Sequence, residues 1–115
     1  MTLPPPADDQ GPLDRAYLRQ AAQGDTGLER EVLGMFLKQS AHLVTALGDL
    51  PPETGALAHT LKGSARAIGA VRVADCAERL EAAIRNGGDT AQALGALDNA
   101  VAEARAAIEA ILERP

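Results

Sequence analysis

Aromatic side chains are almost absent from this sequence. Its 115 residues include one tyrosine, Tyr17, one phenylalanine, Phe36, and no tryptophan. Phe, Leu, Ile and Val together supply 25 residues, a fraction just above the level at which a charged chain usually stays disordered. Because a β-sandwich needs many β-branched and aromatic positions, this composition excludes one. Alanine and leucine, with 24 and 15 residues, favour helices most strongly and predict an all-α fold in one small domain.

Cysteine, long apolar runs and positive charge are scarce as well. The single Cys76 excludes an internal disulfide framework and fits a reducing compartment. No apolar run reaches the roughly 18 residues of a membrane span, and the N-terminus lacks the basic start and apolar stretch of a signal peptide. The net charge of −5 argues against general nucleic-acid binding. These features predict a cytoplasmic protein that binds neither nucleic acid nor membrane.

Hydrophobic spacing and helix breakers divide the chain into a leader and five helices. Residues 1–12, rich in proline, predict a disordered leader, and residues 13–115 form the domain. Helical spacing of apolar residues extends over 13–23, 28–50, 53–69, 71–86 and a final helix after residue 90. Thr54 and Thr90 are the expected caps of the third and last helices. The short connections predict an up-down-up-down four-helix bundle with a short extra N-terminal helix.

The apolar stripes of these helices predict which sides are buried. The second helix has a broad stripe of Leu28, Val32, Met35, Phe36, Leu43, Leu47 and Leu50. The fourth helix has a stripe of Val73, Cys76, Ala77, Leu80, Ala83 and Ile84. The last helix has a seam of Leu94, Leu97, Val101, Ala104, Ile108 and Ile111. The alternating spacing of that seam is typical of left-handed bundle packing.

The third helix differs from the others because a histidine lies opposite its buried stripe. At about 100° per residue, Leu57, Leu61 and Ile68 centre nearly opposite His59, which should therefore point to solvent. Gly63 lies one turn later on the same face, although a glycine inside a helix costs about 1 kcal/mol relative to alanine. Its missing side chain leaves room for another body to approach the imidazole.

The other side chains near the direction of His59 are small or cationic, namely those of Lys62, Arg66 and Ala70. Neutral imidazole is a good nitrogen nucleophile near neutral pH. A phosphoryl group carries nearly two negative charges, which Lys62 and either Arg66 or Arg85 could offset. This combination suits a phosphoryl acceptor. In contrast, His42 is interpreted as an ordinary surface histidine, and the surroundings of His59 do not favour a metal site.

The segment AHTLKGSA at residues 58–65, with Gly69 and Ala70 after it, closely resembles the signature of histidine-containing phosphotransfer (HPt) domains. The resemblance covers about residues 13–112, with Val73 standing where the family tends to have leucine. It implies that His59 is phosphorylated through its outer ring nitrogen. It also implies how four further residues would act. Lys62 would stabilise the phosphoryl charge, Gly63 would admit the partner, Glu81 would orient the ring through its inner nitrogen, and Arg85 would assist electrostatically.

Domains of this class relay phosphoryl groups between aspartates of receiver domains. The resemblance therefore implies a monomeric carrier rather than an enzyme, without a nucleotide site or cofactor of its own. Its partners would be receiver domains of response regulators or of a hybrid histidine kinase, which would supply Mg²⁺ and an acidic pocket. Residues 59–86 hold five basic and three acidic side chains, a balance of +2, and would face that pocket.

Two alternatives stay open at this point. One is a helical interaction module that has kept the bundle and lost the relay. The other is the phosphoacceptor domain of a chemotaxis-type kinase, although the last helix runs directly to Pro115 without a linker. A self-phosphorylating kinase is disfavoured because threonine follows His59, where dimerising kinase helices usually have an acid.

Overall fold

The computed structural model describes residues 11–114, and nearly all of them lie in five helices. The helices are α1 (Arg15–Ala21), α2 (Thr26–Leu47), α3 (Thr54–Ile68), α4 (Val71–Asn86) and α5 (Thr90–Leu112). The described residues contain no strand, so the predicted fold class is confirmed. The predicted disordered leader falls largely on residues 1–10, which lie outside the described residues, as does Pro115.

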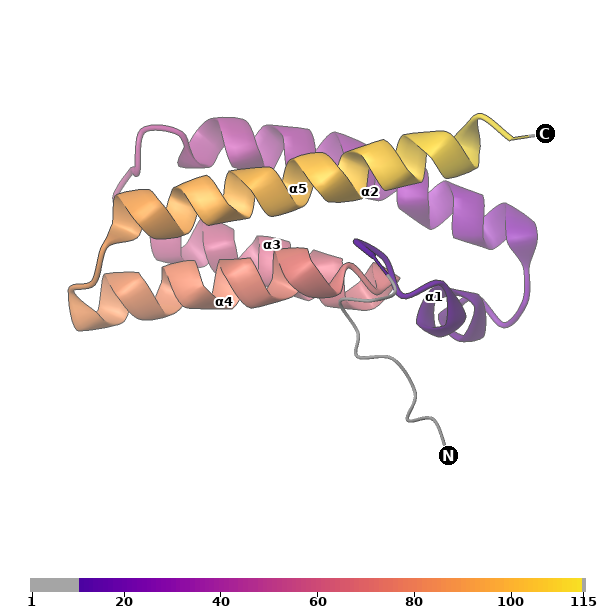
Figure 1. The fold of residues 1–115 in the computed structure, drawn as a ribbon, viewed down its shortest axis with the longest axis horizontal. Coiled ribbons are helices and arrows are strands. Elements are labelled where there is room, and N and C mark those ends of the chain that lie inside the picture. The colour runs from indigo at the N-terminus through magenta and orange to yellow at the C-terminus, as the bar shows by residue number, and fades with distance from the viewer. Residues whose placement is uncertain (1–10, 115) are drawn as a thin grey trace.

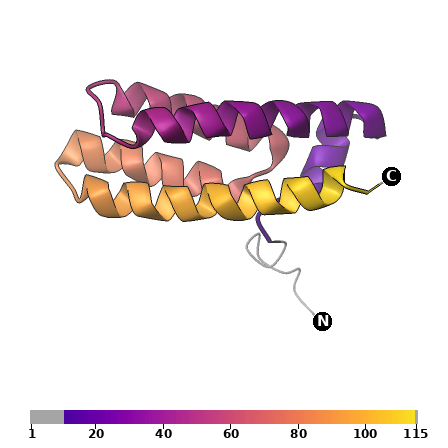
Figure 2. The same cartoon turned by 90° about the horizontal axis from the view of Figure 1, so that it is seen from above.

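Helices α2 to α5 form a four-helix bundle in which consecutive helices run in opposite directions (Figure 1). Helix α2 packs on α3, α3 on α4, α4 on α5, and α5 returns to α2, so the bundle closes. The short α1 packs on α3 and α2 and lies across the end of the bundle where α2 begins (Figure 2). This arrangement confirms the predicted up-down-up-down topology with an extra N-terminal helix.

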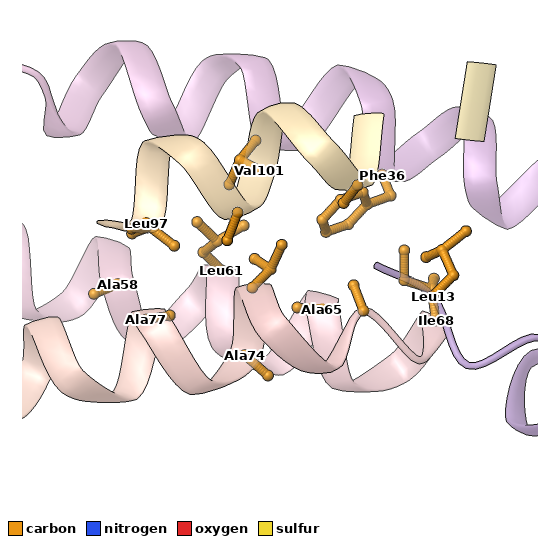
Figure 3. Packing of buried hydrophobic residues seen from close by; sticks show 14 of the residues in the cluster. Leu13, Phe36, Ala58, Leu61, Ala65, Ile68, Ala74, Ala77, Leu97 and Val101 are labelled. Carbon is orange, nitrogen blue, oxygen red and sulfur yellow. The ribbon is translucent and has the colours of Figure 1, made fainter. Parts of the chain in front are cut away.

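Leucine and alanine make up most of the core between these helices (Figure 3). The fully enclosed leucines are Leu18, Leu33, Leu47, Leu61, Leu80 and Leu97. Buried alanines include Ala58 and Ala65 on α3 and Ala74 and Ala77 on α4. Small side chains on two packed helices let the helix axes come close while the interior stays filled. The abundant alanine therefore serves a slim bundle in which α3 and α4 lie tightly together.

Some residues of the predicted stripes lie in solvent instead of the core. Leu28 and Met35 of α2 are 40% and 62% exposed, and Ile84 of α4 is 39% exposed. The prediction was wrong at Leu28, Met35 and Ile84 because a helix at the corner of a bundle cannot bury a stripe that spans more than the two sides facing its neighbours. Cys76 is partly buried and packs against the core. Helix α2 turns Phe36 and Leu47 inward as predicted, and Leu33 and Ser40 with them.

Three aspartates cap the starts of helices, and two of the predicted caps were wrong. Asp14, Asp25 and Asp89 accept backbone N–H bonds from the residues three positions later, at 3.0, 3.0 and 2.9 Å. Thr90 follows Asp89 and is the first residue of α5, not its cap. Thr54 likewise begins α3, and its hydroxyl donates to the carbonyl of Pro51. At α5 the Asp89 carboxylate, one residue before Thr90, reaches the free N–H groups of the first turn, whereas no side chain within residues 11–114 caps the start of α3.

Gly69 joins α3 to α4 and touches the start of α1. Its φ is +79°, and a Cβ there would lie 2.8 Å from the carbonyl oxygen of Asp14. The backbone N–H of Asp14 also donates to the Gly69 carbonyl at 2.8 Å. This close approach fixes α1 against the turn that sets how α4 lies along α3.

We expect Gly69→Ala to lower the free energy of unfolding by about 2–6 kcal/mol, because a left-handed non-glycine residue and an overpacked contact each cost about 1–3 kcal/mol. Gly87→Ala is the matched control. Gly87 has φ +69° but no atom within 4 Å of an added Cβ, so only the backbone term applies. Urea denaturation of both variants measures the difference. Equal losses would contradict a contribution from the Asp14 contact.

Candidate functional site

His59 lies in the middle of α3 on the side that faces solvent. Its side chain is 70% exposed, while Ala58 and Leu61 on the opposite side of the helix are buried. The orientation predicted from the helical period is therefore the one observed. An exposed imidazole on a packed helix is accessible to another protein and keeps a fixed position.

Glu81 of α4 lies against the inner nitrogen of this imidazole. The distance from His59 Nδ1 to Glu81 Oε2 is 3.1 Å, although the two residues are 22 positions apart in the chain. The Glu81 side chain is only 12% exposed, so the surrounding helices hold it in place. The antiparallel packing of α3 and α4 brings these two side chains together.

Lys62 contacts the other oxygen of the same carboxylate. Its Nζ lies 2.6 Å from Glu81 Oε1, and its side chain is 13% exposed. Oε1 is itself shielded from solvent, so the ammonium of Lys62 compensates its charge. Glu81 thus bridges the imidazole and the ammonium. The structure places Lys62 close to His59 but turns its charge toward Glu81.

The charge state of Glu81 determines which ring nitrogen of His59 carries the proton. Partial burial tends to raise the pKa of this carboxyl, but Lys62 and His59 together outweigh burial, and the pKa lies below its ordinary value. Glu81 is therefore ionised near neutral pH and can only accept hydrogen bonds. Consequently Nδ1–H donates to Oε2, and the lone pair lies on Nε2. The outer nitrogen is left as an exposed nucleophile.

Gly63 leaves open space on the side of His59 that faces the C-terminal end of α3. It is exposed, and a Cβ added there would meet no heavy atom within 4 Å. Neither backbone strain nor a close neighbour requires glycine at this position. The missing side chain leaves the imidazole uncovered on this side. In contrast, Ala70 was wrongly predicted to lie on this face, because it is fully buried at the start of α4.

Two arginines complete the charged surroundings. Arg66 lies 3.5 Å from Glu78, and both side chains are more than half exposed, so the pair contributes little to stability. Arg85 lies on α4 one turn after Glu81 and is exposed. Within residues 11–114, no hydrogen bond or ion pair holds its guanidinium. Arg85 is therefore available to an external anion.

Other reactive side chains lie outside this constellation. Burial raises the pKa of the Cys76 thiol, and its acidic neighbours Asp75 and Glu103 act in the same direction against the opposing charge of Arg79. A thiol with a raised pKa is a poor nucleophile near neutral pH. The part of the chain that the structure describes holds no group of three His, Cys, Asp or Glu side chains suited to a metal ion. None of its helices is long and apolar enough to cross a membrane.

The lowered pKa of Glu81 predicts a pH dependence of stability. A carboxyl whose pKa falls on folding stabilises the folded state above its unfolded pKa, about 4.5 for Glu81, and loses that contribution as the pH drops through the folded value. Glu81→Gln should therefore lose less unfolding free energy than the wild type between about pH 5 and pH 3. Urea denaturation across this range measures the difference.

The control for this experiment is Glu78→Gln, which removes a carboxylate that is 57% exposed and only loosely paired. Its stability should follow the pH in nearly the same way as the wild type. A pH profile for Glu81→Gln that coincides with the wild-type profile would show that the contacts to Lys62 and His59 do not stabilise the ionised form.

Comparison with known proteins gives one match. A family model described as Hpt domain matches residues 31–112, which is more than half of the chain. The matched range contains α3, α4, α5 and most of α2, and therefore includes the His59, Lys62 and Glu81 constellation. A comparison with curated proteins and one with solved structures found no match.

Proposed function

Because the chain belongs to the Hpt domain family, we propose that it accepts a phosphoryl group from a receiver-domain aspartate onto His59 and passes it to another such aspartate, or returns it. Family membership places the chain in phosphorelay signalling. The observation that carries the proposal is the Glu81 contact with Nδ1. It leaves Nε2 of a 70% exposed ring as the nucleophile beside the open space at Gly63.

In this reaction the lone pair of Nε2 attacks the phosphorus atom of the aspartyl phosphate. The N–P bond forms as the P–O bond to the aspartate breaks, and the aspartate leaves as a carboxylate. The ring keeps its proton on Nδ1 and becomes positively charged, and the carboxylate of Glu81 stabilises that charge. The reverse reaction restores neutral imidazole. Positioning and charge stabilisation account for most of the catalysis in such a transfer.

The cations around His59 would divide the work of offsetting the phosphoryl charge. Lys62 is paired with Glu81, so its ammonium would interact with the Glu81 carboxylate and the phosphoryl group at the same time. Arg85 has no such partner within the described residues and can turn fully toward the incoming group. The receiver would provide Mg²⁺ and its acidic pocket, which complements this basic face. The chain would act as a monomeric cytoplasmic carrier, without a nucleotide site or cofactor of its own.

The relay is tested by following a radiolabelled phosphoryl group through two steps. The chain is first mixed with a phosphorylated receiver domain and Mg²⁺, then with a second, unlabelled receiver. We expect an acid-labile, base-stable label on the chain that then moves to the second receiver. Absence of label with every receiver of the same cell would favour an interaction module. Label acquired only from ATP and a separate kinase domain would favour the phosphoacceptor domain of a chemotaxis-type kinase.

A further inference from the structure

Gly55 lies one turn before His59, as Gly63 lies one turn after it. Residues four apart share one face of a helix, so Gly55, His59 and Gly63 are aligned. A Cβ added at Gly55 would meet no heavy atom within 4 Å, which is also true at Gly63. The imidazole therefore projects between two helix positions that both lack a side chain.

Local structure and packing do not require glycine at position 55. Its φ is not in the left-handed region, and no neighbouring group approaches it. This differs from Gly69, where both constraints apply. Alanine or glutamine would favour the helix there. Gly95 of α5 also has no heavy atom within 4 Å of an added Cβ, so open space alone does not distinguish Gly55. Gly55 is distinguished by its position one turn from His59.

The antiparallel packing of α3 and α4 places Arg85 level with Gly55. His59 contacts Glu81 and Arg66 contacts Glu78, so a step back along α3 corresponds to a step forward along α4. One turn before His59 is Gly55, and one turn after Glu81 is Arg85. Because position 55 has no side chain, it does not obstruct the exposed Arg85 side chain when that side chain turns toward a partner docked on His59.

We propose that Gly55 is a second access position, so that a phosphorylated receiver domain covers α3 from Gly55 to Gly63 with His59 at the centre. Arg85 then meets the acidic pocket of the receiver from the Gly55 side. Gly55 and Gly63 are eight positions apart, about 12 Å along the helix axis, a length that fits within an interface burying about 800 Å² on each partner. This inference rests on the proposed function and extends the surface that the receiver must contact.

The test compares two phosphoryl donors of very different size. Phosphoramidate is a small molecule whose P–N bond breaks as the Nε2–P bond forms and ammonia leaves, and it needs no docking surface. A phosphorylated receiver must dock. We expect Gly55→Gln to accept phosphoryl groups from phosphoramidate at the wild-type rate. Transfer from the receiver should fall tenfold to about a hundredfold, since a displacement of about 1 Å at the reacting atoms has effects of this order.

Gly95→Gln is the matched control, because Gly95 is an open, exposed helical glycine on α5, the helix diagonal to α3. It should accept from both donors at the wild-type rate. Gly55→Ala should lie between the wild type and Gly55→Gln in transfer from the receiver. Circular dichroism checks that each variant keeps its helices.

Two results would overturn the role of Gly55. The first is transfer from the receiver to Gly55→Gln at the wild-type rate. The second is equal slowing with both donors, which would place the effect on the imidazole itself instead of on docking. A wild-type chain that accepts from phosphoramidate but from no receiver would overturn the proposed function, and this inference with it. The wild-type chain therefore tests the proposed function, and the Gly55→Gln variant tests the role of Gly55.

Discussion

Replacing His59 with glutamine is expected to abolish labelling of the chain by every phosphorylated receiver. Glutamine is polar and of similar length, but its amide nitrogen has a delocalised lone pair and donates hydrogen bonds instead of attacking phosphorus. The variant loses the atom that forms the N–P bond, so the loss is complete and not graded. The measurement is the time course of radiolabel on the chain after denaturing electrophoresis.

His42→Gln is the control for this experiment. His42 is also exposed, but it lies on α2 and is not part of the constellation with Glu81 and Lys62. The variant should be labelled at the wild-type rate. Labelling of His59→Gln at that rate would contradict the assignment of His59. The stability of the label to acid and base would then identify the chemical class of the residue that carries it.

Replacing Gly63 with glutamine is expected to slow transfer from the receiver by about a hundredfold, because a side chain on the face of His59 keeps the reacting atoms from closing to bonding distance. The folded chain itself should tolerate the change. Nothing within the structure lies within 4 Å of an added Cβ, and glutamine has a higher helix propensity than glycine. Quenched time courses of phosphoryl transfer measure the rate, and urea denaturation measures the stability.

The Gly63 prediction has two separable parts. An unfolding free energy equal to or above that of the wild type would show that the glycine is not needed for the fold. A transfer rate equal to that of the wild type would show that clearance at this position is not needed for the reaction. Gly63→Ala, with a single added methyl group, should retain most of the transfer rate if the size of the side chain is what matters.

The helices and the exposed face of α3 could be predicted from the sequence because they depend on local properties. Helical period and backbone propensity fix the direction of His59 relative to Leu61 within one segment, whatever that segment packs against. Pro51, Gly69 and Gly87 interrupt the pattern at the turns for equally local reasons. The five helices were therefore expected in the right order, with ends that differ by a few residues.

Burial was harder to predict where it depends on the neighbours of a helix. Met35 and Leu28 are apolar and in step with the core-facing residues of α2, yet they are exposed, because only α1, α3 and α5 determine which sides of α2 are covered. Ala70 is buried for the same kind of reason. Arg105 was not singled out in the sequence, although its guanidinium donates to the Leu37 carbonyl and to Ser40 Oγ and links α5 to α2.

The sequence by itself determined an all-helical chain with one solvent-facing histidine beside a glycine that helix formation does not need. The tertiary structure decided what surrounds that histidine. The tight turn at Gly69 and the small side chains between α3 and α4 set how far one helix is displaced along the other. That displacement places one carboxylate, Glu81, between the imidazole of His59 and the ammonium of Lys62. A contact between residues 22 positions apart depends on this packing, and no period within a single helix encodes it.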